Sequence, residues 1–488
     1  MKHYDRLLLG LILVTALALR YGPRLILLPD VAREEGSIIQ YAQGLARGDW
    51  SRFWNTPHIP FIGIVLLHWF TGFSINRITI FYNPLLGTIN TLLVYYLLRD
   101  VVEADNPYIG TWLFAVLDSH IYRSSIVGSI GEQFGLVLLF MFVYVYHRKG
   151  LRYGVPILVM LPFTHIIVTG VAFFYVFTDQ VILRKFSLKR LIVFTMAGLL
   201  IGLGFLYVLP YKFAVFGMIE QYTGLMNLET LYSITVNLYL KNLLLTLLGT
   251  TILTLVSVYY FIKKRERATY LYVYMGILFL GCPIFYILSS SHVSVYRLFI
   301  YLGSFGVLTI SSLKHKYRNQ FMLLVGLVML LQVNMYGYNM VMAFDSAITR
   351  EEVVMANWLI EYDDNTHSYH DVGWDHCGMQ YLEYRMYQEA TGIPREPVPQ
   401  HSDVYPGHDV VDLEGDNQVN KLFVYPFTGM RYVVYSDRFS KRAYFRLLDE
   451  YNQYRYNNYI VYDIWKDNPD WKLIYDDVGG KIYESTRN

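Results

Sequence analysis

The chain has 488 residues, of which 54% are hydrophobic and 16% charged, with a mean hydropathy of +0.30. Soluble globular proteins carry about 25% charged residues, so this composition excludes a cytosolic enzyme and predicts a protein that hides much of its length in lipid. Residues 1–336 carry 27 Lys or Arg and 14 Asp or Glu, whereas residues 337–488 carry 14 and 25, and so acidic a C-terminal part argues against nucleic acid as a partner.

The N-terminal residues argue against a cleaved signal peptide, and the cysteines argue against a disulfide or zinc framework. Lys2 and Arg6 precede the first apolar run, but Arg20, Arg24 and the lack of a small-residue cleavage pattern predict an uncleaved first span. The only two cysteines stand in different settings, one in an apolar run and one in the acidic part, so they provide no disulfide or zinc framework.

Eleven apolar runs approach the length of about 20 residues that a membrane-spanning helix needs. We predict spans at 7–27, 78–98, 107–121, 133–147, 153–165, 166–183, 191–211, 240–262, 270–289, 298–313 and 319–337. The third, fifth and sixth are short enough to be re-entrant. All the basic clusters fall on one side if the N-terminus is cytoplasmic. The pattern predicts a multi-pass protein of the plasma membrane with its C-terminal part outside.

The outer side then holds residues 28–77, the region 118–132, a tight turn near 163–166, residues 212–239 and 289–297, and the whole of 338–488. Within the first of these, the apolar stretch His58 to Phe73 is short, so it predicts a helix that lies at the outer interface. Counting it as a span would move every basic loop that follows to the outer side of the membrane.

The C-terminal part predicts a mixed α/β domain of ordinary size. Helices are expected at 346–362 and 440–451, and strands at 421–425, 431–435, 459–463, 471–475 and 481–483. The fold class is therefore a polytopic α-helical membrane protein of about eleven transmembrane helices, residues 1–337, with an extracytoplasmic α/β domain, residues 338–488.

Acidic residues on the outer side are the candidates for chemistry. Glu132 stands where an apolar span begins, and ionisable groups near membrane depth are costly and often functional; the plain alternative is an interfacial Glu paired with Arg123. Glu34 and Glu35 precede an amphipathic stretch that ends in Ala46, where acids in a first helical turn are favoured by the helix dipole. A catalytic reading needs a second site to converge with them, which Glu132, or Asp118 with His120, could provide.

Two outer cations suit a phosphate group. Arg297 lies at the outer start of the tenth span, and a guanidinium binds phosphate bidentately; the alternative is snorkelling to lipid headgroups. Lys212 has the same two readings. His165 is a buried or interfacial histidine that could touch a ligand. The 13 histidines have no paired spacing and give no metal motif.

This order of spans and loops resembles the GT-C superfamily of polytopic glycosyltransferases, in which a first outer loop carries one or two acids followed by a Tyr/Ala/Leu/Gly helix. Here Glu34 and Glu35 stand before Ala42, Leu45 and Gly48. The resemblance implies transfer of a sugar from a polyprenyl (dolichyl) phosphate carrier on the outer face.

The second outer loop is similar to that of the catalytic subunit of oligosaccharyltransferase, including its archaeal form. That subunit has a run R-S-x-x-G-x-x-D-x-E, and this chain has Arg123-Ser124, Gly128 and Glu132, one residue different in spacing and with Ile130 or Gly131 at the Asp position. Asn357-Trp358-Leu359 and Gly373-Trp374-Asp375 resemble its W-L and W-W-D-Y-G segments, which bind the acceptor sequon. The second Trp and the Tyr-Gly pair are not kept.

The resemblance implies inverting transfer. Glu34 or Glu35 would be the base, Glu132 would assist or hold a divalent ion, Arg297 would hold the carrier phosphate, and Arg123, Asp118, His120, Lys212, Trp374 and Asp375 would contact substrates. If the protein resembles oligosaccharyltransferase, Glu35 and Glu132 would bind Mg²⁺ or Mn²⁺. The broken D-x-E run favours a monosaccharide transferase without metal that acts on a glycan or lipid, rather than on protein Asn. A non-catalytic scaffold or transport protein is the alternative from another class.

Overall fold

The computed structural model describes residues 3–27, 35–48, 59–121, 124, 129–183, 247–264, 269–278, 293–332, 354, 358–359, 362, 369–371, 410–412, 421–423, 432–436, 469–477 and 480–486. The chain divides into two compact units, the first made of Met1–Pro23 and Tyr41–Tyr338 and the second of Arg24–Gln40 and Asn339–Asn488.

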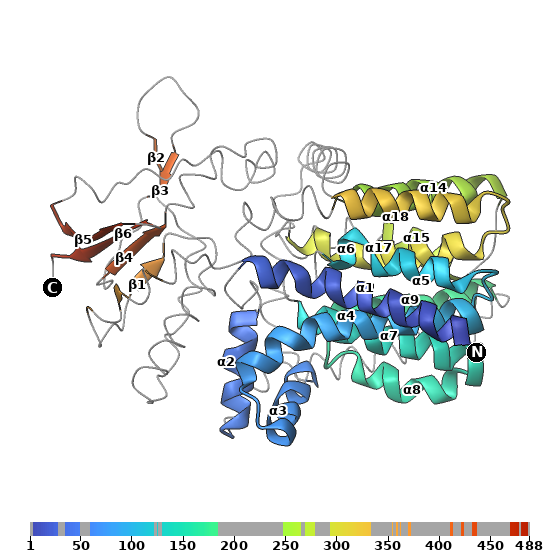
Figure 1. Cartoon of the computed structure of the whole chain (residues 1–488), viewed down its shortest axis with the longest axis horizontal. Coiled ribbons are helices and arrows are strands. Elements are labelled where there is room, and N and C mark those ends of the chain that lie inside the picture. The colour runs from blue at the N-terminus through green and yellow to red at the C-terminus, as the bar shows by residue number, and fades with distance from the viewer. Residues whose placement is uncertain are drawn as a thin grey trace. The chain divides into compact units, whose positions relative to one another are not determined.

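The first unit is a bundle of helices (Figure 1). The helices of the chain are α1 (His3–Leu27), α2 (Glu35–Ala46), α3 (Ile59–Thr71), α4 (Ile75–Asp100), α5 (Pro107–Ala115), α6 (Asp118–Ile121), α7 (Ile130–Lys149), α8 (Leu151–Met160), α9 (Ile166–Phe177), the π-helix η3 (Thr178–Leu183), α14 (Leu248–Lys264), α15 (Thr269–Gly276), α17 (Val293–Ser312) and α18 (Arg318–Gln332). Local chemistry sets several boundaries. Gly150, between α7 and α8, has a φ of 93°, a conformation that favours glycine, and Asn106 caps α5 directly before Pro107.

Contacts between helix ends show how the helices run. The hydroxyl of Tyr144 donates to Asp100 at 3.0 Å, so α4 and α7 end side by side. Ile12 and Ala16 of α1 pack against Ala115, the last residue of α5. The ring of Tyr260 on α14 lies 6.0 Å from that of His315, in the turn between α17 and α18. The basic ends of α4, α7 and α14 and the basic α17–α18 turn therefore lie at one end of the bundle, which we call the basic end.

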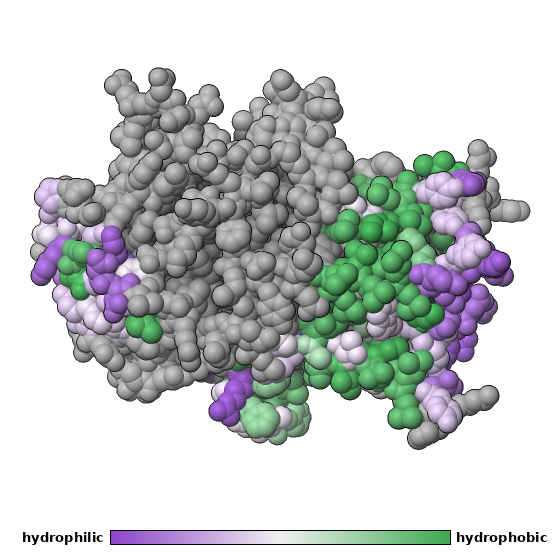
Figure 2. All heavy atoms as spheres, turned by 45° about the horizontal axis from the view of Figure 1, so that its top comes forward, coloured by the Kyte–Doolittle hydropathy of each residue, from purple (hydrophilic) through white to green (hydrophobic). Residues whose placement is uncertain are grey.

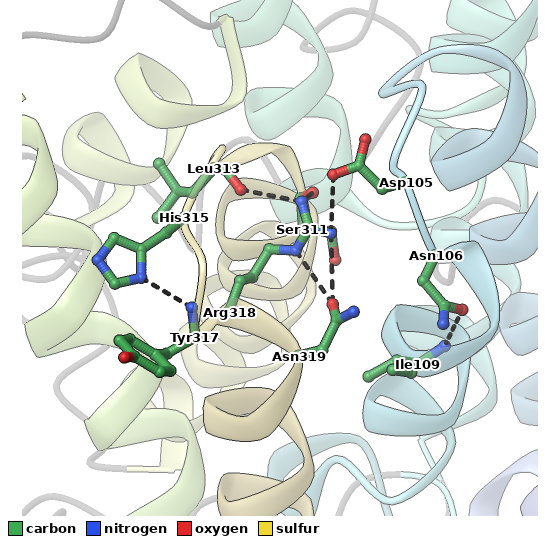
Figure 3. A network of polar contacts seen from close by, with 9 residues as sticks. All are labelled: Asp105, Asn106, Ile109, Ser311, Leu313, His315, Tyr317, Arg318 and Asn319. Atoms are coloured by element: carbon green, nitrogen blue, oxygen red, sulfur yellow. Dashed lines mark hydrogen bonds and ion pairs between the residues drawn. The ribbon is translucent and has the colours of Figure 1, made fainter.

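Arg318 ties three segments together at the basic end (Figure 3). Its guanidinium donates to the carbonyl oxygens of Ser311 at 3.3 Å and Leu313 at 2.9 Å, which are among the last acceptors of α17. It also contacts Asp105, before α5, at 3.1 Å. Because the Arg318 side chain is only 8% exposed, this contact fixes the α17–α18 turn against the start of α5.

Many large apolar side chains of the bundle point outward (Figure 2). They include Leu7, Leu11 and Val14 of α1, Trp69 and Phe70 of α3, Val155 and Val159 of α8, and Leu324, Leu327 and Leu331 of α18. Figure 2 shows hydrophilic residues gathered beyond this apolar surface, at the end where α1 begins. Exposed apolar area of this extent marks a membrane or protein contact. Two described helices, Arg77–Asp100 and Ile130–Lys149, are long and apolar enough to cross a membrane by length and composition.

The helices differ from the predicted spans in instructive ways. The expected span 107–121 is two helices, because the chain turns at Val116 and Leu117 between α5 and α6. The expected span 153–165 is the ten-residue α8 followed by a turn, and ten helical residues rise only about 15 Å. The stretch His58 to Phe73, which was predicted to form a helix, is helical over Ile59–Thr71. The span 191–211 lies outside the described residues.

The second unit contains two sheets. Strands β1 (Tyr369–Asp371), β4 (Tyr432–Ser436), β6 (Gly480–Ser485) and β5 (Trp471–Asp477) form one sheet in this order, and β2 (Val410–Asp412) pairs with β3 (Lys421–Phe423). Only β1 and β4 pair in parallel within the first sheet. Four predicted strands are confirmed in position as β3, β4, β5 and β6, and β1 and β2 were not predicted. The predicted helix 440–451 and strand 459–463 lie outside the described residues.

Trp358 docks a helical turn on the larger sheet. Its ring stacks on Tyr362 with centroids 4.8 Å apart and lies 5.0 Å from the ring of Tyr475 on β5. The Tyr362 hydroxyl donates to Glu484 on β6 at 3.2 Å. Leu359 is 3% exposed. The Trp-Leu pair therefore contributes to the core of this unit.

Candidate functional site

The structure describes the side chains of three predicted site residues, Asp118, His120 and Glu132. Glu35 is the first residue of α2 and Arg297 lies in the first turns of α17, and both are described by backbone alone. The other predicted site residues lie outside the described residues: Glu34, Arg123, Lys212, Trp374 and Asp375.

Glu132 lies in the first turn of α7, at the end opposite the basic end, and its side chain is fully buried. Its Oε1 is 3.7 Å from Nε2 of His165, whose side chain keeps 11% of its surface exposed. His165 is therefore the member of this pair that solvent reaches. The position of Glu132 at a helix N-terminus is favourable for a negative charge. Sequence reasoning singled out both residues, but nothing in their spacing predicted the pair.

Neighbouring contacts hold the first turns of α7 in place. Asn90 of α4 donates to the carbonyl and side-chain oxygens of Gln133 at 3.0 and 3.3 Å. On the other side, a Cβ added at Gly131 would lie 3.5 Å from the Thr164 carbonyl oxygen, within ordinary van der Waals contact. The absence of a side chain at Gly135 lets α9 approach even more closely. A Cβ there would lie 2.6 Å from Cγ2 of Val168 and 3.5 Å from Cβ of His165.

Gly135→Ala is expected to push α9 away from α7 and to lower the free energy of unfolding by about 1–3 kcal/mol, the usual cost of overpacking. Gly170→Ala, on α9, is the matched control because a Cβ there would meet nothing within 4 Å. Thermal unfolding of both variants in detergent checks this, and equal stabilities would contradict the close packing of α7 on α9.

Asp118 caps a helix that lies far away in sequence. One of its carboxylate oxygens accepts from the amides of Gly249 at 2.9 Å and Thr250 at 3.2 Å, in the first turn of α14. The other accepts from the Thr250 hydroxyl at 2.6 Å and the Ser119 amide at 2.7 Å. Because both oxygens have protein donors and the residue is 4% exposed, the observed role of Asp118 is to satisfy the N-terminus of α14.

His120 pairs with an arginine that was not a predicted site residue. Its Nδ1 lies 2.9 Å from Nη2 and 3.3 Å from Nε of Arg20, and both side chains are fully buried. Arginine has no acceptor, so Nδ1 must accept and the ring proton must lie on Nε2. The sequence did contain a signal for Arg20, because this residue lies inside the first apolar run and ionisable groups inside membrane spans are often functional.

The described residues do not assemble a metal site. Among them no three His, Cys, Asp or Glu side chains gather, and the carboxylate of Asp118 already binds the start of α14. Glu132 and His165 offer two ligand types that divalent ions accept, which is fewer than such an ion needs. We therefore derive no chemical step through a metal.

No protein-family model and no curated protein sequence matches the chain. Among solved structures, the chain is similar to the oligosaccharyltransferase of Archaeoglobus fulgidus in complex with Zn and sulfate. The TM-score is 0.51 with 13% identity over 98% of this chain and 73% of that one. A structure of the same protein tethered to an acceptor peptide containing the NVT sequon matches over 78% of this chain and 63% of that one, with a TM-score of 0.47 and 13% identity. The predicted resemblance to archaeal oligosaccharyltransferase is thus confirmed as a distant likeness of fold.

Proposed function

We propose that this chain is a GT-C-type membrane glycosyltransferase that transfers a sugar from a polyprenyl (dolichyl) phosphate-linked donor to an acceptor outside the membrane. The observation that carries the proposal is the likeness of fold to an oligosaccharyltransferase across 98% of the chain. Glu132 beside His165 supports it, because a buried carboxylate facing an imidazole is a frequent arrangement for proton transfer.

The proposed orientation places the basic end in the cytoplasm and the start of α7 at the outer face. Clustered Lys and Arg favour the cytoplasmic side, and the outward apolar side chains of α1, α8 and α18 suit contact with lipid. The Glu132–His165 pair would then lie where a polyprenyl tail stays in lipid while its sugar reaches water. The plasma membrane, the multi-pass topology and the outer position of the C-terminal domain belong to this proposal.

In the proposed mechanism, Glu34 or Glu35 takes the proton of the acceptor as the anomeric carbon becomes cation-like. Glu132 fixes the ring of His165, and the imidazole donates a proton to the phosphate oxygen that leaves the anomeric carbon, as the histidine does for the leaving group in hydrolytic triads. Arg297, on α17, holds the carrier phosphate, for which a guanidinium is well shaped. Arg123 and Lys212 are the further proposed phosphate contacts, and Trp374 and Asp375 the proposed acceptor contacts.

A second candidate is transfer of a lipid-linked glycan to protein Asn, favoured by the likeness of fold to an oligosaccharyltransferase. That neighbour was solved with Zn, so this candidate predicts dependence on a divalent ion, Mg²⁺ or Mn²⁺ included. Against it stands Ile130 or Gly131 at the position where the related run has an Asp.

The test is transfer of labelled sugar in native membranes, with polyprenyl-phosphate monosaccharides and lipid-linked oligosaccharides offered separately, each with and without chelator. We expect transfer from the monosaccharide donor that survives chelation and is lost in Glu34→Gln or Glu35→Gln. Transfer of the oligosaccharide to a sequon peptide, abolished by chelator, would establish the second candidate. No transfer from any donor would favour a scaffold or transport protein.

A further inference from the structure

The guanidinium of Arg20 is a positive charge placed in the interior of the helical bundle. Its side chain is 0% exposed, and among the described residues no carboxylate pairs with it. It donates instead to Nδ1 of His120, at 2.9 and 3.3 Å, and to the carbonyl oxygens of Ala16 and Ala115, both at 2.9 Å. Burying a charge without a counter-charge is costly, so stability alone does not account for an arginine here.

Two of these acceptors belong to the segment that leads to Glu132. Ala115 is the last residue of α5, where unsatisfied carbonyls and the helix dipole both favour a cation. His120 lies in α6, two residues after Asp118, which binds the start of α14. The segment 115–120 is thus held by α1 through Arg20 and by α14 through Asp118.

A series of hydrogen bonds continues from this segment toward α7 along one face of α4. The carbonyl of His120 accepts from the Ser124 hydroxyl at 2.7 Å, and the carbonyl of Ser124 accepts from Asn83 at 2.9 Å. Asn90, seven residues after Asn83 on α4, binds Gln133, next to Glu132. Residues four and seven apart lie on one helical face, so this face meets both ends of the connection between α6 and α7.

Gly87 completes that face, midway between Asn83 and Asn90. A Cβ at Gly87 would lie 2.6 Å from both Cδ and Nε of Arg20 and 3.4 Å from Cε1 of His120. The backbone of α4 therefore lies directly against the guanidinium, and only glycine leaves space for it.

We propose that Arg20 is a positioning residue for sugar transfer: through His120 and Ala115 it sets residues 115–121 and Ser124, and so places Glu132 and His165 at the proposed site. The inference rests on the proposed function for its catalytic consequence. Its structural part, that Arg20 orders this segment, is independent of the reaction.

The test compares Arg20→Leu with Arg318→Leu in the full-length chain. Both arginines are buried and both bind carbonyls at a helix end, but Arg318 lies at the basic end, near the start of α5. Hydrogen exchange is followed in peptides covering 110–135 and 305–325. Transfer is measured as kcat and KM for the polyprenyl-phosphate donor, in membranes of matched protein content and after thermal unfolding confirms a folded fraction.

For Arg20→Leu we expect faster exchange in 110–135 and a kcat about 10–100-fold lower, with KM changed by less than about two-fold, because displacement by about 1 Å can cost 10²-fold in rate. Arg318→Leu is expected to exchange faster in 305–325 and to keep kcat within about two-fold. His120→Asn, which keeps an acceptor near the position of Nδ1, is expected to retain more of kcat than His120→Leu.

Several outcomes would overturn the proposal. They are unchanged exchange in 110–135, a kcat unaffected by Arg20→Leu, and an equal loss of kcat in the two arginine variants, which would indicate a general loss of stability. If Arg20→Leu does not fold, Gly87→Ala displaces the guanidinium by steric contact and is read in the same way. Absence of transfer by the wild-type chain would refute the proposed function, while the exchange comparison would still decide whether Arg20 orders the segment.

Discussion

Glu132→Gln is expected to lower kcat for sugar transfer by about 10²–10⁴-fold, the usual contribution of a positioned acid or base, while the protein stays folded. Glutamine keeps the size of the side chain that is buried in the first turn of α7, but it removes the negative charge 3.7 Å from His165. The loss should therefore appear in kcat rather than in thermal unfolding or in KM for the donor.

Two comparisons make this prediction specific. Glu103→Gln changes an exposed acid near the basic end and is expected to leave kcat unchanged. If Glu132 acts through His165, the double variant Glu132→Gln/His165→Asn should lose no more than the worse single variant, because residues that act as a unit are non-additive. Losses that multiply would show that the two residues act separately, and a fully active Glu132→Gln would remove Glu132 from the site.

Asp118→Ala is expected to have the largest effect on stability, about 2–5 kcal/mol. The substitution leaves the amides of Gly249, Thr250 and Ser119 without their side-chain acceptor inside the bundle, and each unsatisfied buried donor costs about 1–3 kcal/mol. Asp118→Asn keeps one acceptor oxygen and should recover part of the loss. Thermal and denaturant unfolding in detergent, followed by tryptophan fluorescence, would measure both.

The control for this effect is Asp105→Ala. The side chain of Asp105 is 73% exposed, and without it Arg318 keeps its hydrogen bonds to the carbonyl oxygens of Ser311 and Leu313, so we expect a loss of at most about 1 kcal/mol. A loss in Asp105→Ala equal to that in Asp118→Ala would contradict the capping role of Asp118. Faster hydrogen exchange in Asp118→Ala, confined to the first turn of α14, would support that role.

Helices and strands with local signals could be predicted from the sequence. The apolar runs placed α1, α4 and α7 within a few residues of their observed ends, and the strand predicted at 471–475 lies within β5. The break between α5 and α6 was missed because no Gly or Pro stands between Ala115 and Asp118 to mark the turn. The strands β1 and β2 have only three residues each and no local pattern of their own.

The partners within the candidate site could not be predicted, because each depends on tertiary packing. Asp118 and Gly249 are 131 residues apart, and Arg20 and His120 are 100 apart. Sequence alone showed polar groups near the ends of apolar runs. It did not show that Asp118 would cap a helix N-terminus, that His120 would pair with a buried arginine, or that Glu132 would face His165.

The most direct test of the account uses the purified full-length chain in liposomes that contain a polyprenyl-phosphate monosaccharide, with labelled product measured over time. We expect transfer by the wild-type protein and at least about a 100-fold lower rate for Glu132→Gln at equal folded protein. Absence of transfer by the wild-type protein across monosaccharide and oligosaccharide donors, with intact folding, would contradict the proposal that the chain is a glycosyltransferase.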